Sequence, residues 1–265
     1  MNPVTRIGAR VIRPALDQAG YGLWLAGRTL MLLGHVPRRA RALLDYMHAA
    51  GVRTAPVVVF VGFFMGMIVA LQVGLELSRY GQQESIGILV AVTMAREMGP
   101  FVTSIILAAS VASSMAAELG TMKVQEEITA LEVMSVDVGS YLVLPRVLGL
   151  TLMAPILTLM ADAVGILGGG VIAVTQLQLD FQNYLYNVRE ALSRVGDLVP
   201  VPSDLYAGLL KSLVFGFAIA VTGCAAGLRA KGGARGVGET TRAAVRTSVI
   251  LIIVLNFFMG KLLHH

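Results

Sequence analysis

The chain has 265 residues, of which 56% are hydrophobic and only 14% are charged, whereas a typical soluble domain has about 25% charged residues. Its mean hydropathy of +0.75 excludes an ordinary soluble domain, because a core of this length could not bury so much apolar surface. The net charge of +5 comes from arginines near the ends of apolar stretches, so a membrane accounts for it better than nucleic acid does.

Residues 1–54 precede the first stretch that is long enough to cross a bilayer. Residues 21–36 are apolar apart from Arg28 but too few to span, so we expect a helix lying in the membrane interface. Pro37 is expected to end this helix. A basic patch follows, made of Arg38, Arg39, Arg41 and Arg53.

Residues 55–265 are predicted to form an all-α transmembrane domain. Each long apolar stretch in this region can cross a hydrocarbon core of about 30 Å. The second stretch carries two adjacent charges, Arg96 and Glu97, and a Gly99-Pro100 pair that should kink it. The predicted spans are residues 55–77, 85–117, 145–179, 205–228 and 247–263.

An acidic segment, residues 118–137, separates the second and third spans. Val124, Ile128 and Leu131 recur at helical spacing, which predicts an amphipathic helix outside the bilayer. Such a helix is either a solvated surface or an element that couples a cytoplasmic motor to the adjoining spans. The sequence alone leaves both interpretations open.

The number of spans depends on the third stretch, which is long enough for one tilted helix or for a hairpin. The two basic regions are the N-terminal arginines and the loop 229–246, and both are expected on the cytoplasmic side. One span in the third stretch satisfies this, whereas a hairpin gives six spans and separates the two regions. We therefore predict five spans, a cytoplasmic N-terminus, a periplasmic C-terminus and a periplasmic segment at 180–204.

Three pairs of glycines have the GxxxG spacing that lets helices approach closely in lipid. The pairs are Gly62/Gly66, Gly165/Gly169 and Gly223/Gly227. Packing within one chain and packing at a dimer interface both fit this pattern.

No motif for enzymatic chemistry is found in the chain. It has no phosphate-binding loop, nucleophile elbow or zinc-protease motif, and its four histidines have no metal-ligand spacing. The single cysteine, Cys224, excludes an intrachain disulfide. We expect no cofactor or metal on this chain, and any ATP hydrolysis would occur on a partner.

Arg96 and Glu97 are the main candidates for a functional site. Charges at this depth are costly and mark either a pathway or a pairing, and neighbouring helical residues point too far apart to neutralise each other. Lys211 and Asp162 are the available ions in other spans. One hypothesis is that Arg96, with Lys211, binds a lipid phosphate; the other is a structural ion pair such as Glu97 with Lys211.

Several ordered motifs resemble the MlaE/YrbE permease family, from about residue 50 to the C-terminus. They are GMIVALQ (66–72), REMGP (96–100), AAELGTMK (116–123), EEITALE (126–132), YLVLPR (141–146), KS with FG (211–216) and GVG with TT (236–241). The AAELGTMK block is highly specific.

The resemblance implies a permease of the bacterial inner membrane that moves phospholipid to or from periplasmic carriers and maintains outer-membrane lipid asymmetry. Its implied partners are a second copy of itself, a cytoplasmic ATPase dimer, a STAS-domain protein and a hexameric periplasmic ring of MCE domains. It also implies ATPase contacts by the acidic helix, at Glu118, Lys123, Glu126, Glu127 and Leu131.

The resemblance further implies a lipid cavity lined by the first, second and fifth spans. The polar residues that carry over are Arg96, Glu97 and Lys211, and apolar contacts are expected at Leu71, Val73, Leu75, Leu77 and Tyr80. Where relatives often have an aspartate in the last span, this chain has Asn256. An amide can hydrogen-bond but cannot neutralise a cation, so a pairing of that aspartate would be rearranged here.

Two other functions are compatible with a polytopic chain. An ion-coupled transporter could use Glu97 and Asp162 as proton sites, although five spans do not divide into the equal halves typical of that class. A passive membrane scaffold would need neither Arg96 nor Glu97.

Overall fold

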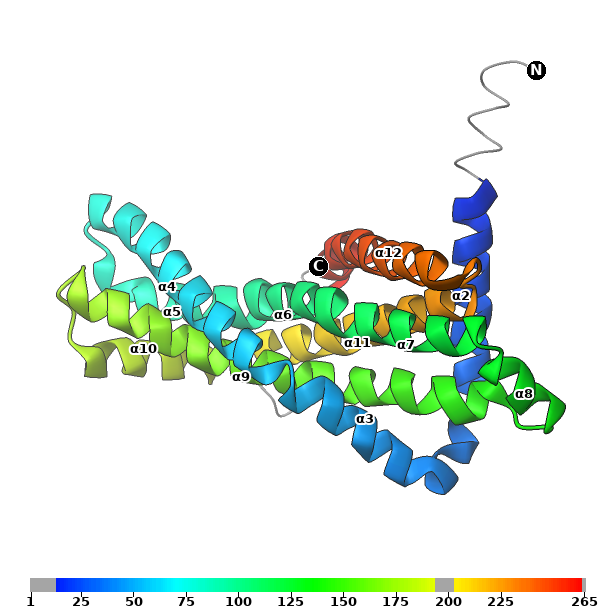
Figure 1. Cartoon of the computed structure of the whole chain (residues 1–265). Helices are drawn as coiled ribbons and strands as arrows, with labels where there is room; N and C mark the ends of the chain where they lie inside the picture. Colours follow the sequence, from blue (N-terminus) through cyan, green and yellow to red (C-terminus); the bar gives the residue numbers. More distant parts are fainter. Residues whose placement is uncertain (1–12, 194–202, 264–265) are drawn as a thin grey trace, which may run out of the picture. The chain divides into compact units, whose positions relative to one another are not determined.

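The computed structural model describes residues 13–193 and 203–263, and within these ranges the chain is helical with no strand (Figure 1). Five of the described helices are long and apolar enough to cross a membrane, which confirms the predicted all-α membrane fold with five spans. The candidate spans are Ala40–Arg79, Gln83–Val124, Gly139–Thr175, Asp204–Leu228 and Gly233–Leu263.

The helices divide into two compact units, which are described separately. The first unit comprises residues 1–48, 108–150 and 217–251. The second unit comprises residues 49–107, 151–216 and 252–265.

The second unit is built on α4 (Ala55–Arg79), which begins with Pro56 in its first turn, where a missing N–H costs nothing. A turn and the short 3-10 helix η3 (Gln83–Ser85) lead into α5 (Ile86–Thr93). The chain then continues through the π-helical turn η4 (Met94–Met98) into α6 (Gly99–Leu107). The second predicted span is thus a series of helical segments, not one regular helix.

A hydrophobic core joins α4, α5, α9 (Leu144–Thr175) and α10 (Phe181–Leu192). Tyr184 is at its centre, and its hydroxyl donates to the carbonyl of Ile166 at 2.8 Å. Figure 1 shows α10 beside α5. Asp180 caps α10, because its side chain accepts from the backbone N–H of Asn183.

Close packing of α4 on α9 requires glycine at the contact. A Cβ on Gly66 would lie 1.8 Å from the carbonyl oxygen of Gly165, and one on Gly62 would lie 3.1 Å from Ala161. In the first unit, Gly223 and Gly227 of α11 (Ser203–Leu228) likewise approach Ala112 and Ala116. The contacts of Gly62, Gly66, Gly223 and Gly227 are therefore packing within one chain.

The first unit contains the N-terminal helices, η5 (Ala108–Ala112), α7 (Ser113–Val124), α8 (Glu127–Val133) and η6 (Gly139–Val143). The N-terminal helices are α2 (Arg13–Met31), η2 (Leu32–Arg39) and α3 (Ala40–Val52). Parts of α9, α11 and α12 (Gly233–Leu263) complete the unit. The alanines Ala116, Ala226 and Ala244 form a small buried cluster where these helices meet.

Several predicted boundaries differ from the structure. Pro37 lies inside η2 and does not end helical structure, because a 3-10 helix and α3 continue after it. The predicted single helix over 118–137 is wrong: α7 runs on to Val124, the chain turns at Glu126 with a left-handed φ of 61°, and α8 begins anew. The predicted basic loop 229–246 is mostly the start of α12, which begins at Gly233.

The third apolar stretch forms one continuous helix of 32 residues, α9, and not a hairpin. The segment predicted as extramembrane at 180–204 begins with α10, whereas residues 194–202 lie outside the described residues. The sequence did contain a signal for α10, because Asp180 is a capping residue and Phe181, Tyr184 and Val188 recur at helical spacing.

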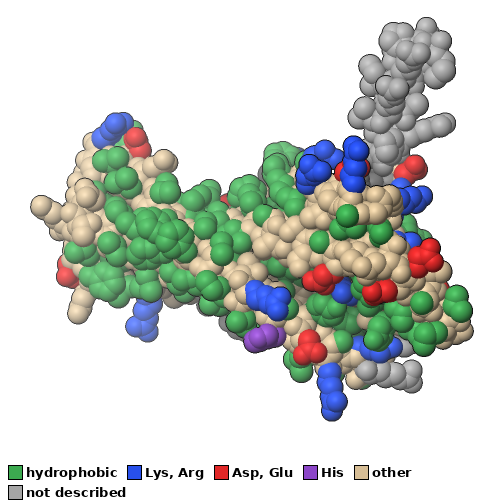
Figure 2. All heavy atoms as spheres, viewed as in Figure 1, with side chains coloured by type: hydrophobic (Ala, Val, Ile, Leu, Met, Phe, Trp, Pro, Cys, Tyr) green, Lys and Arg blue, Asp and Glu red, His purple; other side chains and the backbone are tan. Residues whose placement is uncertain are grey.

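The surface of the second unit around α4, α5 and α10 is largely hydrophobic, with charged side chains at its end (Figure 2). Exposed side chains there include Phe60, Phe64, Ile68, Leu75 and Leu89. Such a large apolar surface is stable only against lipid or another apolar partner.

We expect Gly66→Ala to destabilise the protein, because the new methyl group would collide with the backbone of Gly165. Overpacking of this kind costs about 1–3 kcal/mol, and a backbone obstacle leaves little room for relief. Thermal unfolding of the detergent-purified protein measures the loss as a lower Tm. Gly238→Ala is the control, since nothing lies within 4 Å of its added Cβ; equal Tm values for the two variants would contradict the prediction.

Candidate functional site

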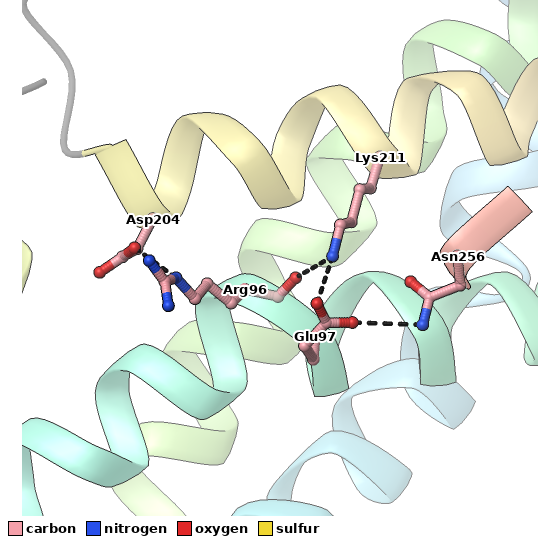
Figure 3. A network of polar contacts seen from close by, with 5 residues as sticks. All are labelled: Arg96, Glu97, Asp204, Lys211 and Asn256. Carbon is pink, nitrogen blue, oxygen red and sulfur yellow. Dashed lines mark hydrogen bonds and ion pairs between the residues drawn. The ribbon is translucent and has the colours of Figure 1, made fainter. Parts of the chain in front are cut away.

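The candidate site is built on the π-helical turn η4 in the second span, which carries Arg96 and Glu97. Single π-turns inside α-helices occur often at functional sites, because the wider turn redirects neighbouring side chains. Arg96 and Glu97 point to different partners on α11 and α12, and Figure 3 shows the resulting network.

Arg96 is paired with Asp204 at the start of α11. Its Nε donates to Asp204 Oδ1 at 2.6 Å, and the side chains are 40% and 12% exposed, respectively. Asp204 lies in the first turn of α11, where the partial positive charge of the helix end also favours a carboxylate. Both terminal nitrogens of the Arg96 guanidinium are left without a protein partner among the described residues.

Lys211 is fully buried and is paired with Glu97. Its Nζ donates to Glu97 Oε1 and to the backbone carbonyl of Arg96, the latter at 3.2 Å. Pro100 has no N–H to offer to the carbonyl of Arg96, which lies one turn before it, so Lys211 supplies a donor there. The ammonium is therefore solvated by protein oxygens instead of water.

Asn256 of α12 completes the network from a third helix. Its Nδ2 donates to Glu97 Oε2 at 3.2 Å, while its own Oδ1 is buried without a partner among the described residues. Gly260, one turn further along α12, leaves space beside the pair: a Cβ there would be 3.7 Å from Glu97 Oε1 and 3.8 Å from Lys211 Nζ.

The register of α11 against η4 is set by Gly208. Asp204, Gly208 and Lys211 lie at i, i+4 and i+7 and so share one face of α11. A Cβ on Gly208 would lie 1.9 Å from the carbonyl oxygen of Ala95, so only glycine lets the two backbones meet here. This contact brings Asp204 and Lys211 to Arg96 and Glu97, respectively.

The structure therefore brings together four predicted site residues: Arg96, Glu97, Lys211 and Asn256. It contains the Glu97–Lys211 pair that one of the two hypotheses named. Sequence reasoning missed Asp204, because it was assigned to the end of an extramembrane segment. Its spacing of seven residues before Lys211 was the signal that could have placed both on one helix face.

The predicted apolar lipid contacts divide into two groups. Leu71 and Leu75 share the exposed face of α4, and Tyr80 is 77% exposed just beyond its end. Val73 and Leu77 instead pack against the core of the second unit. Sequence reasoning missed Phe60, Phe64 and Ile68, which continue the Leu71–Leu75 face at i+4 spacing toward the start of α4.

The predicted coupling residues also differ in exposure. Glu126 and Glu127 are exposed at the start of α8, while Lys123 and Leu131 are half-buried. Glu118 is bound within the first unit, accepting from Ser114 Oγ at 3.0 Å and from the buried Arg146 at 3.3 Å. At the other end of α8, Val133 and Met134 are 81% and 71% exposed, an apolar tip that the sequence did not single out.

The segment after α8 is attached to the N-terminal helix α2. Arg28 Nη2 lies 2.5 Å from Asp137 Oδ1, and the backbone N–H of Ser140 donates to Asp137 Oδ2 at 3.0 Å. Partial burial alone would raise the pKa of Asp137, but the Ser140 hydrogen bond and the Arg28 charge outweigh it and lower the pKa below its ordinary value. Asp137 is therefore a stable anion that fixes α2 beside η6.

Comparison with known proteins identifies the family. The profile of the family described as "Permease MlaE" matches residues 43–262, which include the whole Arg96–Lys211 network. The chain belongs to the MlaE permease family. The sequence resemblance is thus confirmed.

Relatives of this MlaE-family chain occur in several lineages. A probable ABC transporter permease protein of Synechocystis is 37% identical over 91% of this chain and 88% of its own length. The chloroplastic protein TRIGALACTOSYLDIACYLGLYCEROL 1 of Arabidopsis thaliana is 32% identical over 89% of this chain and 65% of its own length. The intermembrane phospholipid transport system permease protein MlaE of Haemophilus influenzae is 27% identical, over 99% of this chain and 98% of its own length.

The buried pair predicts strong energetic coupling between Glu97 and Lys211. Lys211→Met should cost about 1–3 kcal/mol of stability, because it removes the cation that pairs with the partly exposed Glu97 carboxylate. Adding Glu97→Gln should recover part of that loss, with a coupling of about 1–3 kcal/mol in a double-mutant cycle of unfolding free energies. The matched control is the exposed pair Glu76/Arg79, for which the same cycle should give less than about 1 kcal/mol. Additive effects at Glu97 and Lys211 would contradict the prediction.

Proposed function

We propose that this protein is the permease subunit of an ABC transporter that moves phospholipid between the bacterial inner membrane and periplasmic carriers, and so maintains outer-membrane lipid asymmetry. Membership of the MlaE permease family supports this function, as does the phospholipid transport named for the Haemophilus influenzae relative. The chain acts without its own ATPase site, and ATP is hydrolysed by a cytoplasmic partner dimer.

Among the residues of the network, Arg96 gives the strongest support for lipid binding. It is the half-exposed cation of the network, with Nε bound to Asp204 and both terminal nitrogens available. A guanidinium is suited to bidentate contact with a phosphate, whereas the buried Lys211 is already occupied by Glu97. We assign Arg96 to the lipid headgroup and assign Glu97, Lys211 and Asn256 to holding η4 in place.

The lipid tails are expected to contact the exposed apolar face of α4. Leu71 and Leu75 belong to this face, and Tyr80 lies at the interfacial end where amphipathic rings are favoured. Val73 and Leu77 are assigned to the core of the second unit because they pack there. A second copy of the chain would enclose the lipid from the other side.

The exposed end of the first unit at α8 is the proposed contact with the ATPase. Glu126 and Glu127 offer charge, and Val133 and Met134 offer an apolar tip that a groove could enclose. Glu118, Lys123 and Leu131 connect this tip to the body of the unit. The proposed assembly also contains a STAS-domain protein and a periplasmic MCE-domain hexamer, with the N-terminus cytoplasmic and the C-terminus periplasmic.

We expect Arg96→Glu to lower phospholipid transfer by at least about tenfold, because it replaces charge-assisted hydrogen bonds to phosphate with repulsion. Transfer between proteoliposomes containing the assembled transporter and acceptor vesicles measures the effect, and co-purification of the subunits measures assembly. Arg96→Lys should retain part of the activity, since the forked geometry is lost but the charge is kept.

Arg79→Glu is the matched control, because Arg79 is an exposed arginine on α4 whose ion pair with Glu76 is solvated. It should leave transfer within about twofold of the wild type, consistent with the small energies of exposed ion pairs. If Arg96→Glu instead dissociates the complex, or transfers lipid as the wild type does, Arg96 does not bind the headgroup.

We expect Glu127→Lys to uncouple ATP hydrolysis from lipid transfer, because it inverts a charge at the exposed start of α8. Transfer should fall several-fold, while the thermal stability of the isolated permease stays unchanged. Glu190→Lys, an equivalent reversal on the exposed side of α10, is the control and should have no effect on coupling. Normal transfer by Glu127→Lys would argue against α8 as the ATPase contact.

A further inference from the structure

Asp162 is a buried carboxyl that the Arg96–Lys211 network does not include. It lies in the middle of α9, inside the third candidate span, and is only 4% exposed. Both of its oxygens are enclosed, and neither has a hydrogen-bond partner among the described residues. The sequence offered Asp162 as a partner for Arg96 or Glu97, but those residues have other partners, so the role of Asp162 needs another explanation.

The carboxyl of Asp162 lies directly against α6. A Cβ on Gly99 would be 1.7 Å from Asp162 Oδ1, so the side chain occupies the space that any larger residue at position 99 would need. The absence of a side chain at Gly99 thus leaves the space that the enclosed carboxyl of Asp162 occupies. A polar group placed this way is expensive unless it is neutral or satisfied.

Two more unpartnered polar groups lie on the same pair of helices. Met94 packs on Gly165 and Gly99 packs on Asp162, so the second span and α9 run in opposite directions. Thr103 lies one turn beyond Gly99, and Thr158 lies one turn before Asp162, which places both at the next level of the same interface. Their hydroxyls are buried and without partners in the described part of the chain.

Among the described residues, no cation forms an ion pair with Asp162 from the helices named below. On the second span, the nearby ions are Arg96 and Glu97, which are bound to Asp204 and Lys211. On α4, which contacts α9 at Gly62 and Gly66, the charged residues are Glu76 and Arg79, near its end. On α9 itself the other ionisable residue is Arg146, in its first turn and bound to Glu118.

An ionised carboxylate in this environment would cost several kcal/mol, since no described residue supplies a counter-ion or a hydrogen-bond donor to it. A metal cation would not fit here as the compensating charge. Hard cations take about six oxygen ligands, and Asp162 faces a backbone carbon on one side. A proton needs no extra space and removes the charge. The proton is therefore the ligand that this site fits.

We propose that Asp162 is a proton-binding site of the membrane domain and is occupied at neutral pH, with the hydroxyls of Thr103 and Thr158 as its polar neighbours. The binding step is the addition of one proton to a carboxylate oxygen, and no other bond changes. With the proton bound, α6 and α9 pack around a neutral group; loss of the proton at high pH favours opening of this interface to water. The inference does not depend on which cargo the protein moves.

Infrared spectroscopy of the full-length protein in lipid nanodiscs tests the proposal. Protein labelled with 13C at the aspartate side-chain carboxyls should show, at neutral pH, a protonated-carboxyl band shifted by the label. This band should disappear in Asp162→Asn and weaken in the wild type as the pH is raised. Asp180→Asn, which alters an exposed aspartate at the start of α10, is the control and should keep the band.

The absence of a labelled band from the wild type at neutral pH overturns the proposal without any variant, and so does its persistence in Asp162→Asn. If Asp162→Asn fails to fold, Asp162→Glu serves instead, because an unlabelled glutamate removes the isotope shift while keeping a carboxyl. Thr158→Val should move the position of the band, since it keeps the shape and deletes the neighbouring hydroxyl. If the carboxyl band of Asp162 does not move in Thr158→Val, then Thr158 is not part of the proton-binding site.

Discussion

The ion pair between Glu97 and Lys211 is the interaction on which the arrangement of the second, fourth and fifth spans depends. Lys211 is fully buried, so its ammonium is tolerable only because Glu97 and the carbonyl of Arg96 replace its hydration. Asn256 holds the other carboxylate oxygen from α12. A shift of any of these helices by one turn would leave a charge unpaired, so the pair fixes their register as well as their contact.

Glycine and proline make this pairing geometrically possible. Gly208 allows α11 to approach the backbone of η4, and Pro100 frees the carbonyl to which Lys211 donates. Without a hydrophobic driving force between helices in lipid, such close contacts and interhelical hydrogen bonds supply the specificity of association. The REMGP motif is therefore one structural unit: its two charges find partners because its last two residues shape the backbone that presents them.

The fold was largely predictable from the sequence, because apolar stretches of bilayer length allow few alternatives. The single helix over the third stretch followed from the distribution of basic residues, and the Glu97–Lys211 pair was one of two alternatives that the cost of buried charge left open. The π-turn at Met94–Met98 and the break at Glu126 have no signal in the sequence pattern, whereas α10 was overlooked although its cap and apolar spacing are present. Asp204 was missed although its spacing from Lys211 places both on one helix face; its partner Arg96, by contrast, is evident only from the approach of α11 to η4 at Gly208.

Glu97 and Asp162 both place a carboxyl group inside the membrane domain, and the cost of doing so is met differently at each. Glu97 is compensated by a cation and an amide from two other helices, and these contacts fix the register of the helices. Asp162 lies against Gly99 and has no hydrogen-bond partner among the described residues, which favours its neutral form. The second span is therefore held to α11 by the ion pair of Glu97 with Lys211, and to α9 by the contact of Gly99 with Asp162, which depends on a bound proton.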